Sequence, residues 1–352
     1  MISIPTRLCT AVDSAVLWRL GMISVAPRTG VQEDPLDPEA FWRASRVLDP
    51  APLSARLVNP PPWARLLPRA SRPTFMELVG PSRGPGDHWG ATNLKAHVAL
   101  SPRADAPFVL LLHGYAVPAP WYEERQMQVL ARRGISSARL EMPFHLSRRL
   151  PRQPVGAGYF SSDTVRTLAV LSQTTEDSSA VLAWARDELG MPRIGVHGVS
   201  LGGLIGGLLA ANMEMDSAIL ISPPCDLAAI MMEYAPIRLR RELDIVDGRG
   251  GPWGADTASA RATLARELAP VTLRHLRPRM RPDRIVVVLA NHDRIVGAGP
   301  VRDMATTWGA EVWPYSTGHV TLLAARGLGG RIHDRLERDL VTAPEPAAAL
   351  AG

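Results

Sequence analysis

A serine flanked by glycines lies in the segment Gly198-Val199-Ser200-Leu201-Gly202, which has the pattern G-x-S-x-G. The β-branched residues before it predict a short strand, and the glycine-studded apolar run after it predicts a helix. Glycines two residues either side of the serine fit a tight turn, because larger side chains would collide with the backbone there. Ser200 would then lie at a helix N-terminus, where free N–H groups and the helix dipole favour negative charge. We therefore predict that Ser200 is a nucleophile; an ordinary glycine-rich corner is the competing interpretation.

An acid and a histidine follow later in the chain, each just after a predicted strand. Asp293 comes after the apolar run 285–290, and His319 after the run 311–315. A serine hydroxyl needs a base to take its proton, and an aspartate on the far side of the imidazole fixes its tautomer. We predict that His319 is the base and Asp293 the acid. Asp226, which follows the strand predicted at 217–221, is the alternative acid.

A continuous apolar run at 108–112 predicts a strand buried on both faces. It ends in His113-Gly114-Tyr115, beside the position expected for Ser200. We predict an oxyanion hole formed by an amide of Tyr115 or Ala116 and the amide of Leu201. His113 follows this strand and comes before Ser200 in the chain. It is a candidate for substrate contact, but we favour a role in bracing the loop over one as catalytic base.

Other side chains are candidates for substrate contact. His145 and Arg148 follow the strand predicted at 135–140, at the edge of the sheet where ligands bind. We favour a bracing role for both over direct contact. Met231 and Tyr234 either line an acyl pocket or only pack their segment onto the body.

The sequence divides into an extension, a large domain and a short tail. Residues 1–73 are rich in proline and arginine, with helices predicted at 11–22 and 38–47. Residues 74–342 alternate strand and helix patterns, which predicts an α/β domain with a mostly parallel sheet flanked by helices. The long segment 223–283 between two strands is predicted to be a helical cap. We expect the alanine- and proline-rich tail, 343–352, to be frayed.

Composition narrows the function classes. The chain has 352 residues, and its net charge of +5 is spread along it, so we do not expect nucleic-acid binding. It lacks an apolar run long enough to span a membrane, and we expect no stable membrane insertion. Its two cysteines form no disulfide framework, which favours a cytoplasmic location. We identify no metal-ligand pattern, and the oligomeric state stays open.

These motifs together resemble the α/β hydrolases over roughly three quarters of the chain. A branch related to abhydrolase-domain-containing protein 18 is similar in four segments: Leu111-Leu112-His113-Gly114-Tyr115, Met142-Pro143-Phe144-His145 with Arg148, Gly158-Tyr159-Phe160-Ser161-Ser162-Asp163, and Gly198-Val199-Ser200-Leu201-Gly202-Gly203. The resemblance implies a serine hydrolase without a cofactor.

We therefore expect hydrolysis of a small-molecule carboxylic ester, thioester or amide through an acyl-enzyme on Ser200. The alternatives are an acyltransferase or peptidase with the same three residues, and a catalytically silent binding protein with this fold.

Overall fold

The computed structural model describes Cys9 and residues 11–14, 36–47, 49–86, 88–235 and 237–342. In this part of the chain, one nine-stranded sheet has the order β1-β2-β3-β5-β4-β6-β7-β8-β9. The first three strands pair antiparallel, and β3 is antiparallel to β5. The six strands from β5 to β9 in that order are parallel. The strands are β1 Ser54–Leu57, β2 Thr74–Pro81, β3 Asn93–Leu100, β4 Phe108–Leu112, β5 Ser136–Leu140, β6 Ile194–Val199, β7 Ser217–Ile221, β8 Ile285–Ala290 and β9 Glu311–Tyr315.

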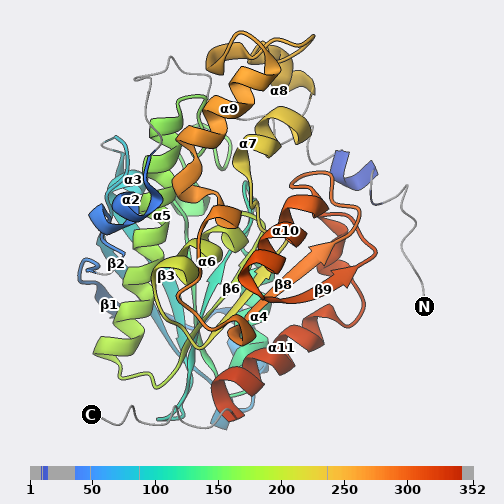
Figure 1. Cartoon of the computed structure of the whole chain (residues 1–352). Helices are drawn as coiled ribbons and strands as arrows, with labels where there is room; N and C mark the ends of the chain where they lie inside the picture. The colour runs from blue at the N-terminus through green and yellow to red at the C-terminus, as the bar shows by residue number, and fades with distance from the viewer. Residues whose placement is uncertain are drawn as a thin grey trace, which may run out of the picture.

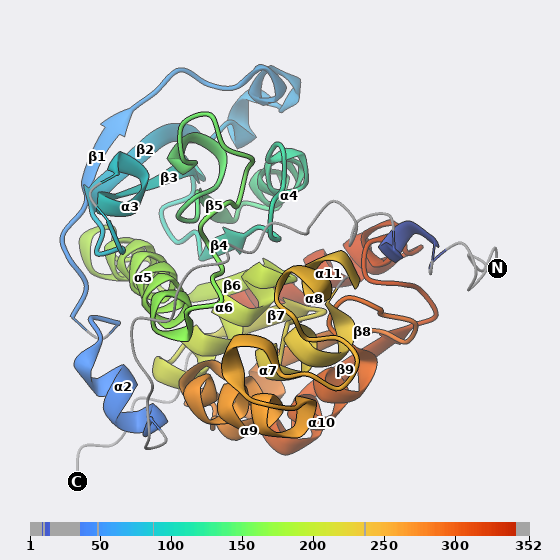
Figure 2. The ribbon, with the colours of Figure 1, turned by 90° about the horizontal axis from the view of Figure 1, so that it is seen from above.

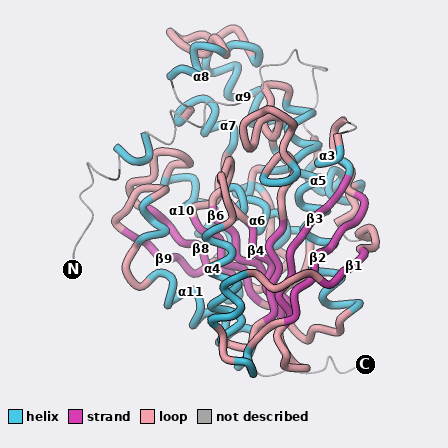
Figure 3. Tube along the Cα trace, turned by 180° about the vertical axis from the view of Figure 1, so that it is seen from behind, coloured by secondary structure: helices cyan, strands magenta, loops and turns pink. Residues whose placement is uncertain are grey.

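The two faces of the sheet carry separate apolar cores. In β4, Phe108, Leu110 and Leu112 face one core, while Val109 and Leu111 face the other. Helices cover both faces of the sheet. The alternate residues that would face solvent in a sheet covered on one side are therefore buried here as well. Figure 3 shows the strands from behind, with α4 and α11 on the near side. The mostly parallel sheet flanked by helices confirms the predicted fold class.

The helices follow the predicted alternation with the strands (Figure 1). They are α2 Pro38–Ala44, α3 Trp89–Thr92, α4 Trp121–Arg132, α5 Thr164–Ala183, α6 Leu201–Asn212, α7 Leu227–Ala229, α8 Ile237–Glu242, α9 Thr257–Glu267, α10 Ala298–Trp308 and α11 Leu328–Glu337. Short π-helical turns extend α5 to Glu188 and α11 to Thr342. Among the described residues, no helix combines the length and apolar character needed to cross a membrane.

The segment between β7 and β8 is helical, as the sequence predicts for residues 223–283. Its helices α7, α8 and α9 stand at the top of Figure 1. Seen from above in Figure 2, they lie over the part of the sheet that holds β7, β8 and β9. This arrangement puts the segment above the carboxyl ends of the parallel strands, where the loops that carry polar residues begin.

Parts of the N-terminal extension pack onto the large domain. The strand β1 adds an edge to the sheet, and it was not predicted because all four of its side chains are exposed and show no alternation. In α2, the indole Nε1 of Trp42 donates to the carbonyl of Pro270 at 2.7 Å. Of the helix predicted at 11–22, residues 11–14 are helical, and the remainder lies outside the described residues, as does the tail 343–352.

Candidate active site

Ser200 lies in a sharp turn between β6 and α6. Its φ of 52° is unusual for a residue with a side chain, and such backbone strain costs about 1–3 kcal/mol. Its amide donates to the carbonyl of Ile221 at 2.8 Å, which ties the turn to the neighbouring strand. A Cβ at Gly198 would overlap the carbonyl of Gly202, and a Cβ at Gly202 would overlap that of Leu112. Both glycines are therefore required by close backbone approach.

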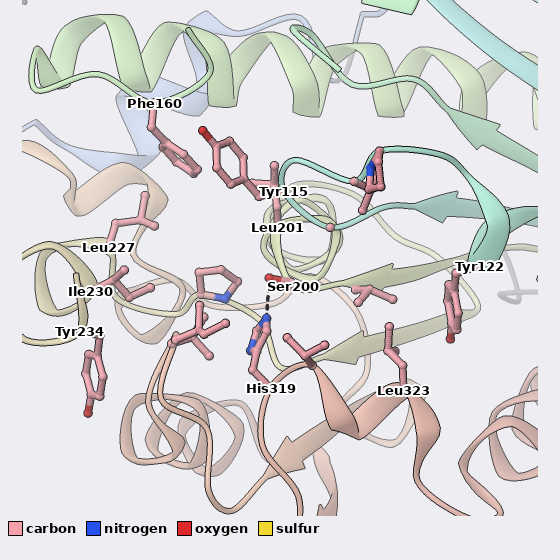
Figure 4. A pocket seen from close by; sticks show the side chains of 18 of the residues that line it. Tyr115, Tyr122, Phe160, Ser200, Leu201, Leu227, Ile230, Tyr234, His319 and Leu323 are labelled. Carbon is pink, nitrogen blue, oxygen red and sulfur yellow. Dashed lines mark hydrogen bonds between the residues drawn. The ribbon is translucent and has the colours of Figure 1, made fainter. Parts of the chain in front are cut away.

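His319 lies between Ser200 and Asp293. Its Nε2 is 2.9 Å from the hydroxyl of Ser200, the contact drawn as a dashed line in Figure 4. Its Nδ1 is 2.7 Å from Oδ2 of Asp293. The other carboxylate oxygen of Asp293 accepts from the amides of Ile295 and Val296 at 2.9 and 3.0 Å. The structure thus joins the three side chains, from the ends of β6, β8 and β9, in one hydrogen-bonded row.

The charges in this row stabilise an ionised acid beside a basic imidazole. Burial opposes ionisation of Asp293, but the nearby His319 and the two backbone amides outweigh it and lower the pKa of the carboxyl. Burial also opposes protonation of His319, but the negative charge and the hydrogen bond of Asp293 raise the pKa of the imidazole above its ordinary value. This arrangement suits a histidine that takes a proton from serine and holds it while charge develops.

Asp226, the alternative acid, has other partners. Its Oδ1 accepts from the amide of Ala229 at 2.9 Å and caps α7. Its Oδ2 pairs with Arg261 at 2.9 Å and with Arg274 at 3.0 Å. The carboxylate therefore holds the helical segment above the sheet, and the structure puts Asp293 against His319 instead.

Tyr115 and Leu201 both border the space in front of the Ser200 hydroxyl. Gly114 lies against the serine, since a Cβ built on it would be 3.7 Å from that of Ser200. The amide of Ala116, the other donor considered after β4, instead donates to Nε2 of His145 at 2.9 Å. Of the two amides predicted for this loop, that of Ala116 is therefore already used by the imidazole of His145.

His113 and His145 are buried behind the loop and do not line the cavity. Nε2 of His113 accepts from the amide of Met142 at 3.2 Å, so its Nδ1 carries the proton that is donated to Gly114 O at 2.7 Å. His145 repeats the pattern, with Nε2 toward Ala116 and Nδ1 2.8 Å from the carbonyl of Pro143. Burial lowers the pKa of His113 to about 4 and that of His145 well below its usual value. Both rings act as neutral braces, the role favoured from the sequence, and neither reaches the cavity to contact substrate.

Arg148 also lies away from the cavity, and its side chain is fully buried. Its guanidinium donates to Asp177 at 2.8 Å and to the carbonyls of Gly90 and Glu141 at 2.9 and 2.8 Å. These bonds tie the exit of β5 to α5 and to α3. Arg148 therefore braces the structure, as favoured from the sequence, and does not reach the cavity to contact substrate.

A cavity of about 530 Å³ opens in front of Ser200 and His319 (Figure 4). Met231 and Tyr234 lie in its wall, which is one of the two positions that the sequence left open for them. The sequence did not single out several other lining residues, which are mostly apolar or aromatic: Trp121, Tyr122, Glu123, Phe160, Leu227, Ile230, Leu239 and Leu323. They come from four separate segments, so no local pattern marks them as one group.

Glu123 is the acidic side chain among these lining residues. Burial raises the pKa of its carboxyl to about 7, partly offset by hydrogen bonding to its own backbone and by Arg139. Its neutral form therefore preserves the apolar character of the wall at mildly acidic pH.

Comparison with known proteins supports the fold and a family likeness. Residues 118–229 match the family model described as alpha/beta hydrolase domain containing 18. This segment includes Ser200 and ends before Asp293 and His319. No curated protein sequence matches the chain.

Two solved structures are similar over most of the chain. Acetyl xylan esterase 1 from Thermoanaerobacterium sp. JW/SL YS485 has a TM-score of 0.61 at 14% identity, covering 96% of this chain and 99% of that one. An acetyl xylan esterase from Paenibacillus sp. R4 has a TM-score of 0.58 at 14% identity, covering 88% and 95%. At this identity the likeness establishes the shared α/β-hydrolase fold.

Proposed function

Because the chain has the α/β-hydrolase fold and resembles the abhydrolase-domain-containing 18 family over residues 118–229, we propose that it is a serine hydrolase of carboxylic esters. The observation that carries the proposal is the hydrogen-bonded row of Ser200, His319 and Asp293 at the floor of an apolar cavity. The esterase activity named for the two similar structures agrees with it.

In the acylation step, the Ser200 oxygen attacks the ester carbonyl while Nε2 of His319 takes the hydroxyl proton. The negative charge moves to the carbonyl oxygen, facing the amides of Tyr115 and Leu201. One such donor typically contributes about 2.7–4 kcal/mol to transition-state stabilisation. His319 then gives its proton to the leaving alkoxide, and an acyl group remains on Ser200.

In the deacylation step, water takes the place of the alcohol. His319 removes a proton from this water as it attacks the acyl carbon, and it returns the proton to Ser200 when the ester bond breaks. Asp293 stays ionised throughout and stabilises the imidazolium. The cycle consumes one water and releases one acid and one alcohol.

The cavity wall favours an acyl or alcohol group that is itself apolar. Phe160, Leu227, Ile230 and Met231 offer hydrocarbon surface, and burying apolar area contributes about 25 cal/mol per Å². Thioesters and activated amides present the same electrophilic carbon and fit the same chemistry.

The decisive experiment is active-site labelling with a fluorophosphonate probe. The wild-type protein should be labelled and should hydrolyse p-nitrophenyl esters, whereas Ser200→Ala should do neither while keeping its thermal unfolding midpoint. Equal labelling of both proteins would overturn the assignment of the nucleophile. A folded wild-type protein that shows neither labelling nor turnover over a range of acyl lengths would favour a silent binding protein.

A further inference from the structure

A short N-terminal helical segment reaches the loops that carry the acid and the base. It comprises Cys9 and residues 11–14. In Figures 1 and 2 this dark blue turn lies beside the C-terminal loops and well apart from α2, the next described helix along the chain. Asp13, within this segment, has no solvent exposure. A fully buried carboxylate needs compensating hydrogen bonds, so its partners matter.

The partners of Asp13 are backbone amides of the two loops. Its Oδ2 accepts from the amide of His319 at 2.8 Å and from that of Arg294 at 3.3 Å. Its Oδ1 accepts from the amide of Val320 at 3.1 Å. Arg294 directly follows Asp293, so one carboxylate joins the acid loop after β8 to the histidine loop after β9.

Further contacts hold the N-terminal segment against the loop that carries His319. Thr321 Oγ1 donates to the buried Cys9 sulfur at 3.4 Å, and the same hydroxyl accepts from the amide of Gly318 at 3.0 Å. A Cβ at Gly318 would lie 2.7 Å from Oδ2 of Asp13, too close for any side chain. The glycine before the histidine therefore leaves room for this carboxylate.

We propose that Asp13 is a positioning residue for the reaction on Ser200, holding the acid and histidine loops together so that His319 stays between Ser200 and Asp293. This inference rests on the proposed hydrolase function. Removing the carboxylate frees three amides at once, and both loops then lose their common anchor. Displacement of a catalytic group by about 1 Å costs on the order of 100-fold in rate.

The negative charge of Asp13 adds an electrostatic effect. Burial lowers the pKa of His319, and the charges of Asp293 and then Asp13 raise it above the usual value. Loss of the charge at Asp13 lowers the pKa of His319. Because the neutral imidazole is the active base, the acidic limb of the pH–rate profile then moves to lower pH.

The test is Asp13→Asn, which keeps the shape of the side chain. Both carboxylate oxygens accept amide hydrogens, so an asparagine must turn its NH₂ group toward at least one N–H donor. We expect kcat for a p-nitrophenyl ester to fall about 100-fold with KM nearly unchanged, and the acidic limb to shift downward. Asp216→Asn is the matched control, since Asp216 also accepts a backbone amide, that of Ile194 at 3.0 Å, before β7 and away from the site.

Each outcome decides the proposal. If Asp13→Asn has the kcat and pH profile of the wild type, or if Asp216→Asn changes both equally, Asp13 does not position His319. If Asp13→Asn does not fold, Asp13→Glu retains the charge with a longer reach: lowered kcat with an unshifted acidic limb supports the proposal, and wild-type kcat overturns it. Failure of the hydrolase function itself is distinguishable, because the wild type would then show no turnover or labelling.

Discussion

Replacing Asp293 by asparagine tests the direction of proton transfer in the proposed mechanism. Oδ1 of Asp293 accepts two backbone amides, and Oδ2 faces Nδ1 of His319 at 2.7 Å. An asparagine keeps both amide bonds only if its carbonyl oxygen takes the Oδ1 position. Its NH₂ group then points at Nδ1 of His319, which must lose its proton so that it can accept a hydrogen bond. The proton of the neutral ring moves to Nε2, where the lone pair that should receive the Ser200 proton is lost.

The expected loss of kcat depends on how unfavourable the opposite orientation of the asparagine side chain is. Turning the asparagine over would present NH₂ to two buried amides, and each unsatisfied buried donor costs about 1–3 kcal/mol. The unproductive tautomer is therefore the stable one. The corresponding change in Ser–His–Asp proteases lowers kcat about 10⁴-fold. We expect a similar loss for Asp293→Asn, equivalent to about 5 kcal/mol of barrier.

The assay compares Asp293→Asn with Asp226→Asn in kcat for a p-nitrophenyl ester and in the rate of fluorophosphonate labelling. Asp226 pairs with Arg261 and Arg274, so its loss should lower the unfolding midpoint while kcat stays within about tenfold of the wild type. Circular dichroism checks that both variants are folded. If Asp226→Asn loses orders of magnitude and Asp293→Asn does not, the assignment of the acid is refuted.

Two further predictions concern the turn at Ser200 and the cavity wall. Gly202→Ala drives a Cβ into the carbonyl of Leu112, so we expect it to lower stability by about 1–3 kcal/mol and to abolish the labelling of Ser200. Gly330→Ala places its Cβ in open space in α11 and should raise stability by about 0.5–1 kcal/mol. Equal unfolding midpoints for the two variants would contradict this. Burial raises the pKa of Glu123 from 4.5 to about 7, so the folded state holds a proton that the unfolded state releases, and stability falls by about 3 kcal/mol as pH rises across that interval. Urea unfolding at several pH values should show this slope in the wild type and lose it in Glu123→Gln; parallel slopes would disprove the effect.

The sequence alone carries much of the fold because strand signals are local. Runs such as 108–112 and 285–290 are apolar at every position, which fits strands covered on both faces. The edge strand β1 could not be predicted, because its four exposed residues form neither an apolar run nor an alternating pattern. The positions of Ser200, Asp293 and His319 could also be predicted, since each follows a strand and parallel strands end at one edge of the sheet.

The sequence left the roles of other polar residues open. His113, His145 and Arg148 carry chemistry that suits either substrate contact or bracing, and only their burial and partners select bracing. The choice between Asp293 and Asp226 likewise depends on which carboxylate reaches His319 and which reaches two arginines. These contacts join distant segments, so no local spacing encodes them.

Asp13 shows the contrast most clearly. The sequence around it predicts only the helix at 11–22, with no pattern of a catalytic site. Folding brings its carboxylate to the amide of His319, across 306 positions of the chain. The sequence determined which residues have the chemistry for a serine hydrolase and where along the strands they lie. Tertiary structure decided which of them meet, because hydrogen bonds depend on distances of about 3 Å that are set only when the whole chain packs.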